Sequence, residues 1–205
     1  MGLALALLAG APAGAVPIDF FCITNNAASQ CAIGEAQLAV ELTDEGAGQV
    51  RFTFTNTGAQ DITISEVYFD DGTLFGIASV LSGAGVSFVQ DANPPDLPGG
   101  NSISPPFNVT AGFLAEATPP PASNGVDPGE WVAIIFNLQG GGTLANVIDE
   151  LADGTLRIGI HAISIGTGEG SESFVNVPVP EPATALLLFG GLVAIATRRR
   201  EAKRR

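Results

Sequence analysis

Alternation of apolar and polar residues is the feature that most limits what this chain can fold into. In QVRFTFTN, the apolar residues Val50, Phe52 and Phe54 alternate with charged or hydroxyl-bearing ones. A period of two places apolar side chains on one face of an extended strand and polar side chains on the other. Residues 36–43 repeat the pattern, and the intervening segment 44–48 contains glycines that favour a tight turn. We therefore predict a β-hairpin with one buried face.

Six more segments have strand-like patterns, and Gly, Asp and Pro turns separate them. They span residues 62–69, 74–80, 85–90, 131–138, 156–165 and 171–177. In the first of these segments the apolar period shifts, which predicts a β-bulge near Ser65 and Glu66. About eight strands in a domain spanning residues 16–177 predict an all-β fold, an antiparallel β-sandwich.

One segment has a helical period instead. Apolar residues recur at i, i+3, i+4 and i+7 from Leu144 to Leu151, with Thr143 placed to cap the first turn and Gly154 to end the helix. We predict one short crossover helix that covers an end of the sandwich. Residues 91–129 hold most of the prolines and little periodicity, so we expect a long Pro/Gly-rich surface loop there.

The first 15 residues have the pattern of a signal peptide. A short apolar run ends in small residues, and Ala13 and Ala15 fit the A-x-A pattern of a signal-peptidase site. No Lys or Arg precedes the run, which a start codon placed too far downstream would explain. A buried N-terminal helix is the alternative. We expect the Sec translocon and signal peptidase as partners, with cleavage after Ala15.

Cysteine usage agrees with export. Cys22 and Cys31 are the only two cysteines, and a close, even pair in an exported chain favours a disulfide. The bond is expected to pin the N-terminal segment to the first strand, and two free thiols are the alternative. A zinc site needs more soft ligands than these two residues supply.

The charge of the body excludes one class of partner. The chain has a formal net charge of −13, and six of its eight basic residues lie in the tail, residues 198–205. Between Ile18 and Val177 only Arg51 and Arg157 are basic, against 19 acidic residues, which gives this part a charge of −17. Nucleic-acid binding depends on clustered Lys and Arg. We therefore expect no nucleic-acid partner.

Candidate catalytic residues are few. His161 is the only histidine, lies in the middle of a predicted strand, and shares a face with Arg157 if that strand is regular. The chain contains no nucleophile elbow of the G-x-S-x-G type, although Ser-His-Asp triads can assemble from distant positions. We expect a partnered structural histidine, no catalytic residue and no cofactor.

Acidic residues beside glycine, in segments 68–73 and 126–130, admit two interpretations. Loops of this kind supply oxygen ligands to calcium, and Asp-Gly and Asp-Pro-Gly are also strong turn formers. The alternating acids of an EF-hand loop are absent. We therefore expect turns and no metal site, with calcium binding as the alternative.

The chain has one Trp and one Tyr, and most of its aromatic residues are Phe on expected core faces, so few aromatics are placed to bind carbohydrate. Trp131 is turned away from the core by the pattern of its strand, because Val132 and Ile134 claim the inner face. Exposed aromatic platforms are common on carbohydrate-binding surfaces. Asn108 begins an N-V-T acceptor sequence for N-glycosylation, a match that arises often by chance.

The C-terminal region has an apolar run followed by a basic tail, which is the sequence of features expected of a temporary transmembrane helix. Residues 183–197 form an apolar run of about 22 Å as a helix, which is short of a hydrocarbon core of about 30 Å. The basic tail that follows predicts a cytoplasmic end, with the acidic body on the other side of the membrane. A core helix is disfavoured because Gly190 and Gly191 interrupt the run.

This tail, residues 178–205, resembles the PEP-CTERM sorting signal. The motif residues are Pro180, Glu181 and Pro182, and the basic stop after the apolar run is Arg198, Arg199 and Arg200. The resemblance implies a Gram-negative type of bacterium and recognition by an exosortase, a membrane cysteine transpeptidase that cuts near the Pro-Glu-Pro site. A proline on each side of Glu181 favours an extended, accessible strand.

The resemblance implies a route with a transient stay in the inner membrane and a destination at the cell surface or in the extracellular matrix. We expect a structural or interaction protein, not an enzyme, with extracellular polysaccharide as a candidate partner. A carbohydrate- or calcium-binding sandwich is the first alternative, and a secreted hydrolase is the second. The alternatives predict an exposed Trp131 or, for a hydrolase, His161 beside an acid and a nucleophile in a cleft.

Overall fold

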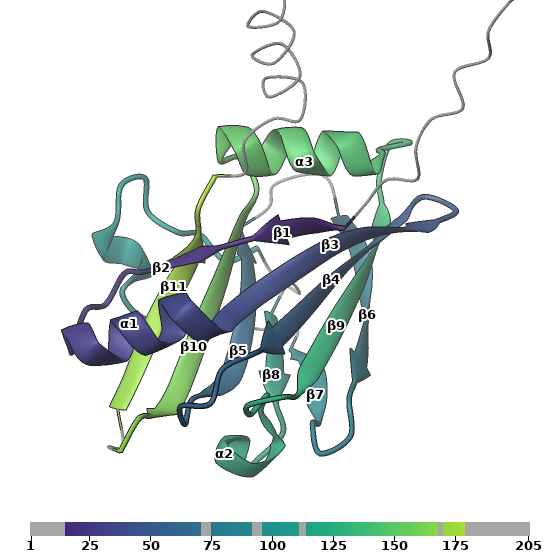
Figure 1. The fold of residues 1–205 in the computed structure, drawn as a ribbon. Helices are drawn as coiled ribbons and strands as arrows, with labels where there is room; N and C mark the ends of the chain where they lie inside the picture. Colours follow the sequence, from purple (N-terminus) through teal and green to yellow (C-terminus); the bar gives the residue numbers. More distant parts are fainter. Residues whose placement is uncertain (1–14, 71–74, 92–95, 111–113, 168–169, 179–205) are drawn as a thin grey trace, which may run out of the picture.

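The computed structural model describes residues 15–70, 75–91, 96–110, 114–167 and 170–178. In these residues eleven strands form two antiparallel sheets that face each other, so the predicted all-β fold is confirmed (Figure 1). The five-stranded sheet has the order β1 (Val16–Ile18), β3 (Leu38–Gly46), β4 (Gln49–Asn56), β9 (Trp131–Leu138), β6 (Phe75–Ser82). The six-stranded sheet has the order β2 (Phe20–Cys22), β11 (Gly170–Asn176), β10 (Arg157–Ile165), β5 (Thr63–Asp70), β8 (Leu114–Ala117), β7 (Phe88–Asp91).

The estimate of about eight strands was too low, because β1, β2 and β8 were missed. These strands have three, three and four residues. A strand this short shows too few alternations for a period of two to stand out from the sequence. Each of the three is fixed by pairing with a longer neighbour in the sheet.

Aromatic side chains join the two sheets at the centre of the core. Phe52 of β4 and Phe136 of β9 come from one sheet and Phe69 of β5 from the other, and all three are almost completely buried. Ring centroids of Phe69 lie 5.3 Å from Phe52 and 4.8 Å from Phe136, with edge-to-face angles. Such pairs add to the free energy gained by burying the rings.

The predicted hairpin and the predicted bulge are both confirmed. Strands β3 and β4 pair antiparallel, and Gly46 and Gly48 adopt the positive φ values that the turn between them requires. In β5 the register against β10 shifts so that His161 pairs with Glu66 while Ala162 pairs with Ile64. Ser65 is therefore the extra residue of the bulge.

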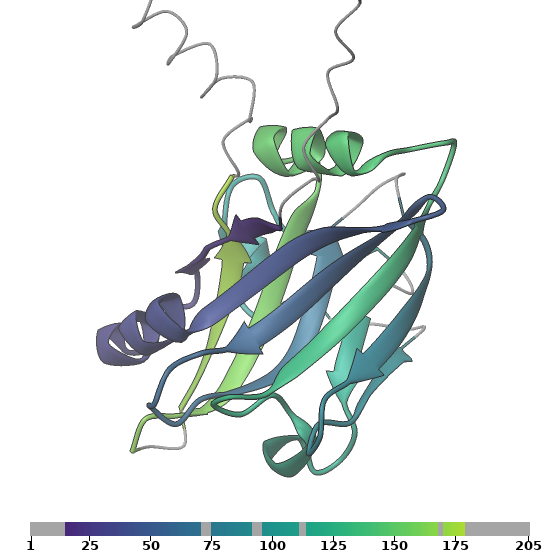
Figure 2. The ribbon, with the colours of Figure 1, turned by 45° about the vertical axis from the view of Figure 1, so that its right-hand side comes forward.

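The predicted crossover helix is α3 (Leu144–Asp153), which joins β9 of one sheet to β10 of the other across an end of the sandwich (Figures 1 and 2). Thr143 and Asn146 form a capping box at its start, and Gly154 adopts a left-handed conformation at its end. The four apolar residues that carried the prediction, Leu144, Val147, Ile148 and Leu151, are all buried.

The prediction of a single helix was wrong, because the described residues also contain α1 (Ala28–Gln37) and the short α2 (Pro121–Asn124). Small and polar residues dominate α1, so no apolar stripe marks it in the sequence. Its place is set by close packing instead. A Cβ atom on Gly34 would lie 2.1 Å from the ring of Phe174, so only glycine lets the helix approach β11 this closely.

The prediction that residues 91–129 form a loop was also wrong in part. This segment contains β8, which pairs with β5 and β7 inside the six-stranded sheet, as well as α2 and a short 3-10 turn, Gly100–Ser102. Prolines flank these elements and obscure them in the sequence. Among the described residues, no helix is long and apolar enough to cross a membrane.

Candidate functional site

Most residues predicted to direct sorting lie outside the described part of the chain. These are Ala13, Pro180, Glu181, Pro182, the apolar run 183–197, and Arg198, Arg199 and Arg200. Ala15 of the predicted cleavage site is the first described residue; it is exposed and directly precedes β1. Pro178, at the other end, is the last described residue.

The C-terminal strand of the body lies beside a strand close to its N-terminus. The backbone N–H of Val177 donates to the carbonyl of Asp19 over 2.8 Å, and β11 pairs antiparallel with β2 up to Asn176, which stands opposite Phe20. The end of β11 lies at the end of the sandwich that α3 covers (Figure 1). Asp19 stands four residues after Ala15, so at most about 14 Å of chain separates this contact from the first described residue.

The predicted disulfide is present, with Sγ atoms of Cys22 and Cys31 2.06 Å apart. It joins the end of β2 to α1, whereas we expected it to pin the N-terminal segment to the first strand. The carboxylate of the buried Glu172 accepts from the backbone N–H groups of Asn26 and Ala27, directly before α1. The covalent bond and the buried carboxylate both anchor α1 to the six-stranded sheet.

His161 and its neighbours form a polar cluster on the outer face of the six-stranded sheet. Its Nδ1 lies 2.8 Å from Oε2 of Glu66 on the adjacent strand, and the Tyr68 hydroxyl donates to the same oxygen over 2.7 Å. The hydroxyl of Ser65 donates to the His161 carbonyl and lies 3.5 Å from Nδ1. Because of the bulge, Ser65 and Glu66 both reach the same histidine.

The environment shifts two pKa values in this cluster. The pKa of the Glu66 carboxyl lies below its ordinary value, chiefly because the His161 ring hydrogen-bonds it and also because Tyr68 donates to it. Burial, followed by the hydrogen bond to Glu66, raises the pKa of the Tyr68 hydroxyl. Glu66 is therefore an ionised acceptor at neutral pH, and Tyr68 is a neutral donor.

A pocket of about 250 Å³ opens beside this cluster. Its polar lining comes from Ser65, Glu66, Glu116 and His161, and its apolar lining from Ala117, Pro119, Pro121 and Ile163. An acid and a serine thus stand beside His161 in a hollow, as the hydrolase alternative predicts. In a Ser-His-acid triad, however, the acid and the serine bind opposite ring nitrogens, whereas Ser65 and Glu66 both lie beside Nδ1. This arrangement is not that of a triad.

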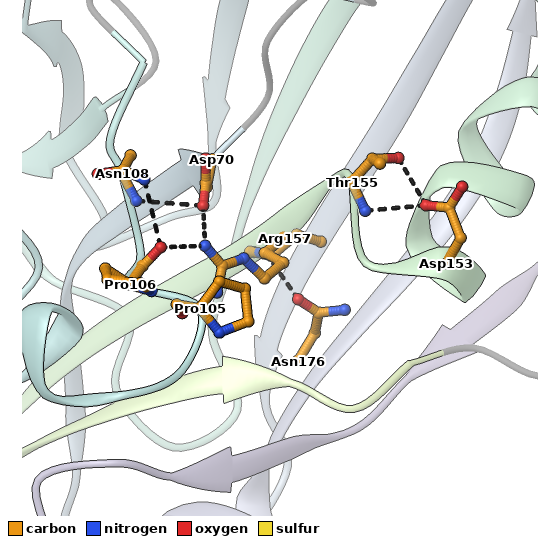
Figure 3. A network of polar contacts seen from close by, with 9 residues as sticks. Asp70, Pro105, Pro106, Asn108, Asp153, Thr155, Arg157 and Asn176 are labelled. Atoms are coloured by element: carbon orange, nitrogen blue, oxygen red, sulfur yellow. Dashed lines mark hydrogen bonds and ion pairs between the residues drawn. The ribbon is translucent and has the colours of Figure 1, made fainter.

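Arg157, on the same face as His161, is held in a second polar network (Figure 3). Its guanidinium forms an ion pair with Asp70 and donates to the backbone carbonyls of Pro105 and Pro106. The guanidinium also lies 5.2 Å from the centroid of the Phe107 ring. Asp70, one of the acids considered for calcium, is thus the partner of an arginine that ties a surface loop to β10.

Asp127, in the other acidic segment, closes a turn. Its backbone N–H donates to the Glu130 carboxylate over 3.0 Å, and its own carboxylate accepts from the Thr63 hydroxyl. Asp127 and Asp61 also line a pocket of about 490 Å³ near α2, together with Ser164. These contacts favour the interpretation of segment 126–130 as a turn.

Trp131 lies where the strand pattern predicts. It is the first residue of β9 and is 38% exposed on the outer face of the five-stranded sheet, while Val132 and Ile134 are buried. Leu81, on the neighbouring strand β6, is similarly exposed. The exposure that the carbohydrate-binding alternative requires is therefore present.

The polar pocket beside His161 was not predicted. The single histidine and the predicted bulge at Ser65 and Glu66 were the available signals, but nothing in the sequence showed that their two strands pair with each other. Glu116, the fourth polar residue of the pocket, stands directly opposite Glu66 on β8. Because β8 was taken for loop, this cross-strand position could not be assigned.

Comparison with known proteins identifies the tail alone. The model of the PEP-CTERM protein-sorting motif matches residues 178–200. This motif marks proteins that an exosortase sorts to the cell surface, so the resemblance found in the sequence is confirmed. No curated protein and no solved structure matches the chain.

Proposed function

We propose that this protein is exported, held briefly in the inner membrane by residues 183–197, and released by an exosortase to act at the cell surface or in the extracellular matrix. The observation that carries the proposal is the match of residues 178–200 to the PEP-CTERM motif. We propose a structural or interaction role for the acidic sandwich rather than catalysis, because the Ser65, Glu66 and His161 cluster lacks the arrangement of a triad.

The geometry of the body supports a membrane-held intermediate. Val177 is bonded to Asp19, only four residues after Ala15, so a signal peptide and a C-terminal anchor can enter the same membrane without strain on the fold. Four residues separate Pro178 from Ala183, and an extended chain spans at most about 3.6 Å per residue. The Pro180 to Pro182 motif therefore lies in a short stretch between the folded body and the bilayer, where a membrane enzyme can reach it.

The motif is tested by replacing Glu181 with Gln in the full chain and following the protein in fractionated cells. We expect the variant to accumulate uncut in the inner membrane, while the wild type reaches the surface or the medium. Glu201→Gln, which changes an acid beyond the arginines, is the matched control and is expected to behave as wild type. Equal release of both variants would contradict the proposal.

Carbohydrate binding is a second candidate function, and the exposure of Trp131 favours it. An indole on a flat sheet face offers an apolar surface against which a sugar ring can stack, together with a polar N–H. Trp131 is the only tryptophan, so its fluorescence reports on this face alone. Binding of extracellular polysaccharide from the cells that produce the protein is expected to change that emission. An unchanged spectrum at saturating polysaccharide would eliminate carbohydrate binding at Trp131.

A further inference from the structure

Two of the four polar residues that line the pocket beside His161 are acids. Glu66 and Glu116 contribute carboxylates, which only accept hydrogen bonds when ionised. The hydroxyl of Ser65 already donates to the His161 carbonyl. The remaining polar group that can face a ligand is the imidazole of His161 itself.

The Glu66 contact determines which nitrogen of the neutral imidazole carries the proton. Because the ionised carboxylate can only accept, Nδ1 of His161 must be the donor across the 2.8 Å contact. The lone pair of the neutral ring is then on Nε2, which has no hydrogen-bond partner among the described residues. The ring of His161 thus brings a third acceptor to the pocket, in an orientation fixed by Glu66.

A pocket of acceptors calls for a ligand that donates. A primary ammonium has three N–H donors and no acceptor, and its charge complements the two carboxylates as well as the surrounding body of −17. Pro119, Pro121 and Ile163 provide an apolar wall for the carbon chain attached to such a group. Anionic ligands are disfavoured by the same charges.

We propose that this pocket is a binding site for a primary ammonium group, which donates to Nε2 of His161 and to the Glu116 carboxylate. The inference goes beyond sorting and does not depend on it, since it concerns only the folded body. Amine-bearing polymers of an extracellular matrix present groups of this kind.

Nitrogen NMR of the single histidine tests the proposal in the full chain held in detergent, at pH 9. Long-range proton–nitrogen spectra are expected to show a protonated Nδ1 and an unprotonated Nε2. The probes are putrescine and 1,4-butanediol, which have the same carbon chain but carry ammonium groups and hydroxyls, respectively. Putrescine is expected to shift the Nε2 signal with a millimolar dissociation constant, and butanediol is expected to leave it in place.

Two variants separate the site from general attraction to an acidic protein. Glu116→Gln is expected to weaken putrescine binding at least about tenfold, the size of one lost hydrogen bond to a charged group. Glu41→Gln, an exposed acid on the opposite sheet, serves as the matched control and is expected to leave binding unchanged. The proposal is overturned if putrescine does not shift Nε2, if butanediol shifts it equally, or if the two variants weaken binding to the same extent.

Discussion

At the scale of single residues, the structure gives the one histidine of the chain a defined partner. The sequence predicted that His161 would be partnered but could not name the acid, because 19 candidates occur in the body. The register of β10 against β5 selects Glu66. The bulge that makes this contact possible was visible as a break in the apolar period, whereas its consequence for side-chain direction required the neighbouring strand.

The Glu66 contact predicts a pH-dependent stability. A carboxyl whose folded-state pKa is lowered contributes stability that is present above its unfolded pKa, near 4.5, and is lost as the pH falls through the lower folded value. Glu66→Gln is therefore expected to lower the free energy of unfolding at pH 7, and the difference from wild type should shrink towards pH 3. Urea unfolding at both pH values measures this. A difference that is unchanged at pH 3 would show that the ionised carboxylate is not responsible.

Gly34 is a second residue whose role only packing reveals. Gly34→Ala should raise the intrinsic helix propensity of α1 yet destabilise the protein by about 1–3 kcal/mol, because the new methyl group would overlap the Phe174 ring. Denaturant unfolding gives the sign. Ser29→Ala, on an exposed position of the same helix, is the control and should be neutral or slightly stabilising. A stabilised Gly34→Ala variant would contradict the packing argument.

At the scale of elements, predictability follows the strength of the local pattern. Helix α3 was predicted with both of its ends because a cap, an apolar stripe and a terminal glycine all agree. Helix α1 and strand β8 have no such agreement and owe their conformation to tertiary contacts: the disulfide and Gly34 for α1, and pairing with β5 and β7 for β8. Sequence patterns alone do not contain these contacts.

The cap of α3 makes a testable contribution. Thr143→Ala removes the hydroxyl that accepts from the Asn146 backbone N–H and should cost about 1 kcal/mol of unfolding free energy. Thr143→Ser keeps the hydroxyl and should recover most of that loss. Thermal unfolding followed by circular dichroism compares the three proteins, and equal loss in both variants would mean that the cap does not act through its hydroxyl.

The disulfide makes a covalent contribution to the stability of a different helix, α1. Replacing both Cys22 and Cys31 with Ser reopens a ring of sequence separation 9 and should cost about 2–3 kcal/mol, the loop entropy expected for a ring of this size. Native-state hydrogen exchange should then show faster exchange in α1 than in β4. Protection of α1 equal to that of wild type would indicate that Glu172 and packing hold the helix without the bond.

At the scale of the whole molecule, an acidic β-sandwich is followed by a C-terminal sorting motif. The fold class could be predicted from the alternation of apolar and polar residues, and the sorting signal from a short C-terminal motif. The relative positions of the N-terminal and C-terminal strands could not be predicted. Only the structure places β2 beside β11, and hence the C-terminal strand close to the N-terminal part of the body. That adjacency makes attachment to one membrane at both ends compatible with a folded domain.

The central claim is that an exosortase removes the tail, and intact-mass spectrometry of the protein from cells with and without the enzyme tests it most directly. In cells with the exosortase, the measured mass should correspond to a chain that ends near Pro180 to Pro182. Without it, the mass should include the full tail to Arg205. The same C-terminus in both strains, whether cut or uncut, would contradict the claim.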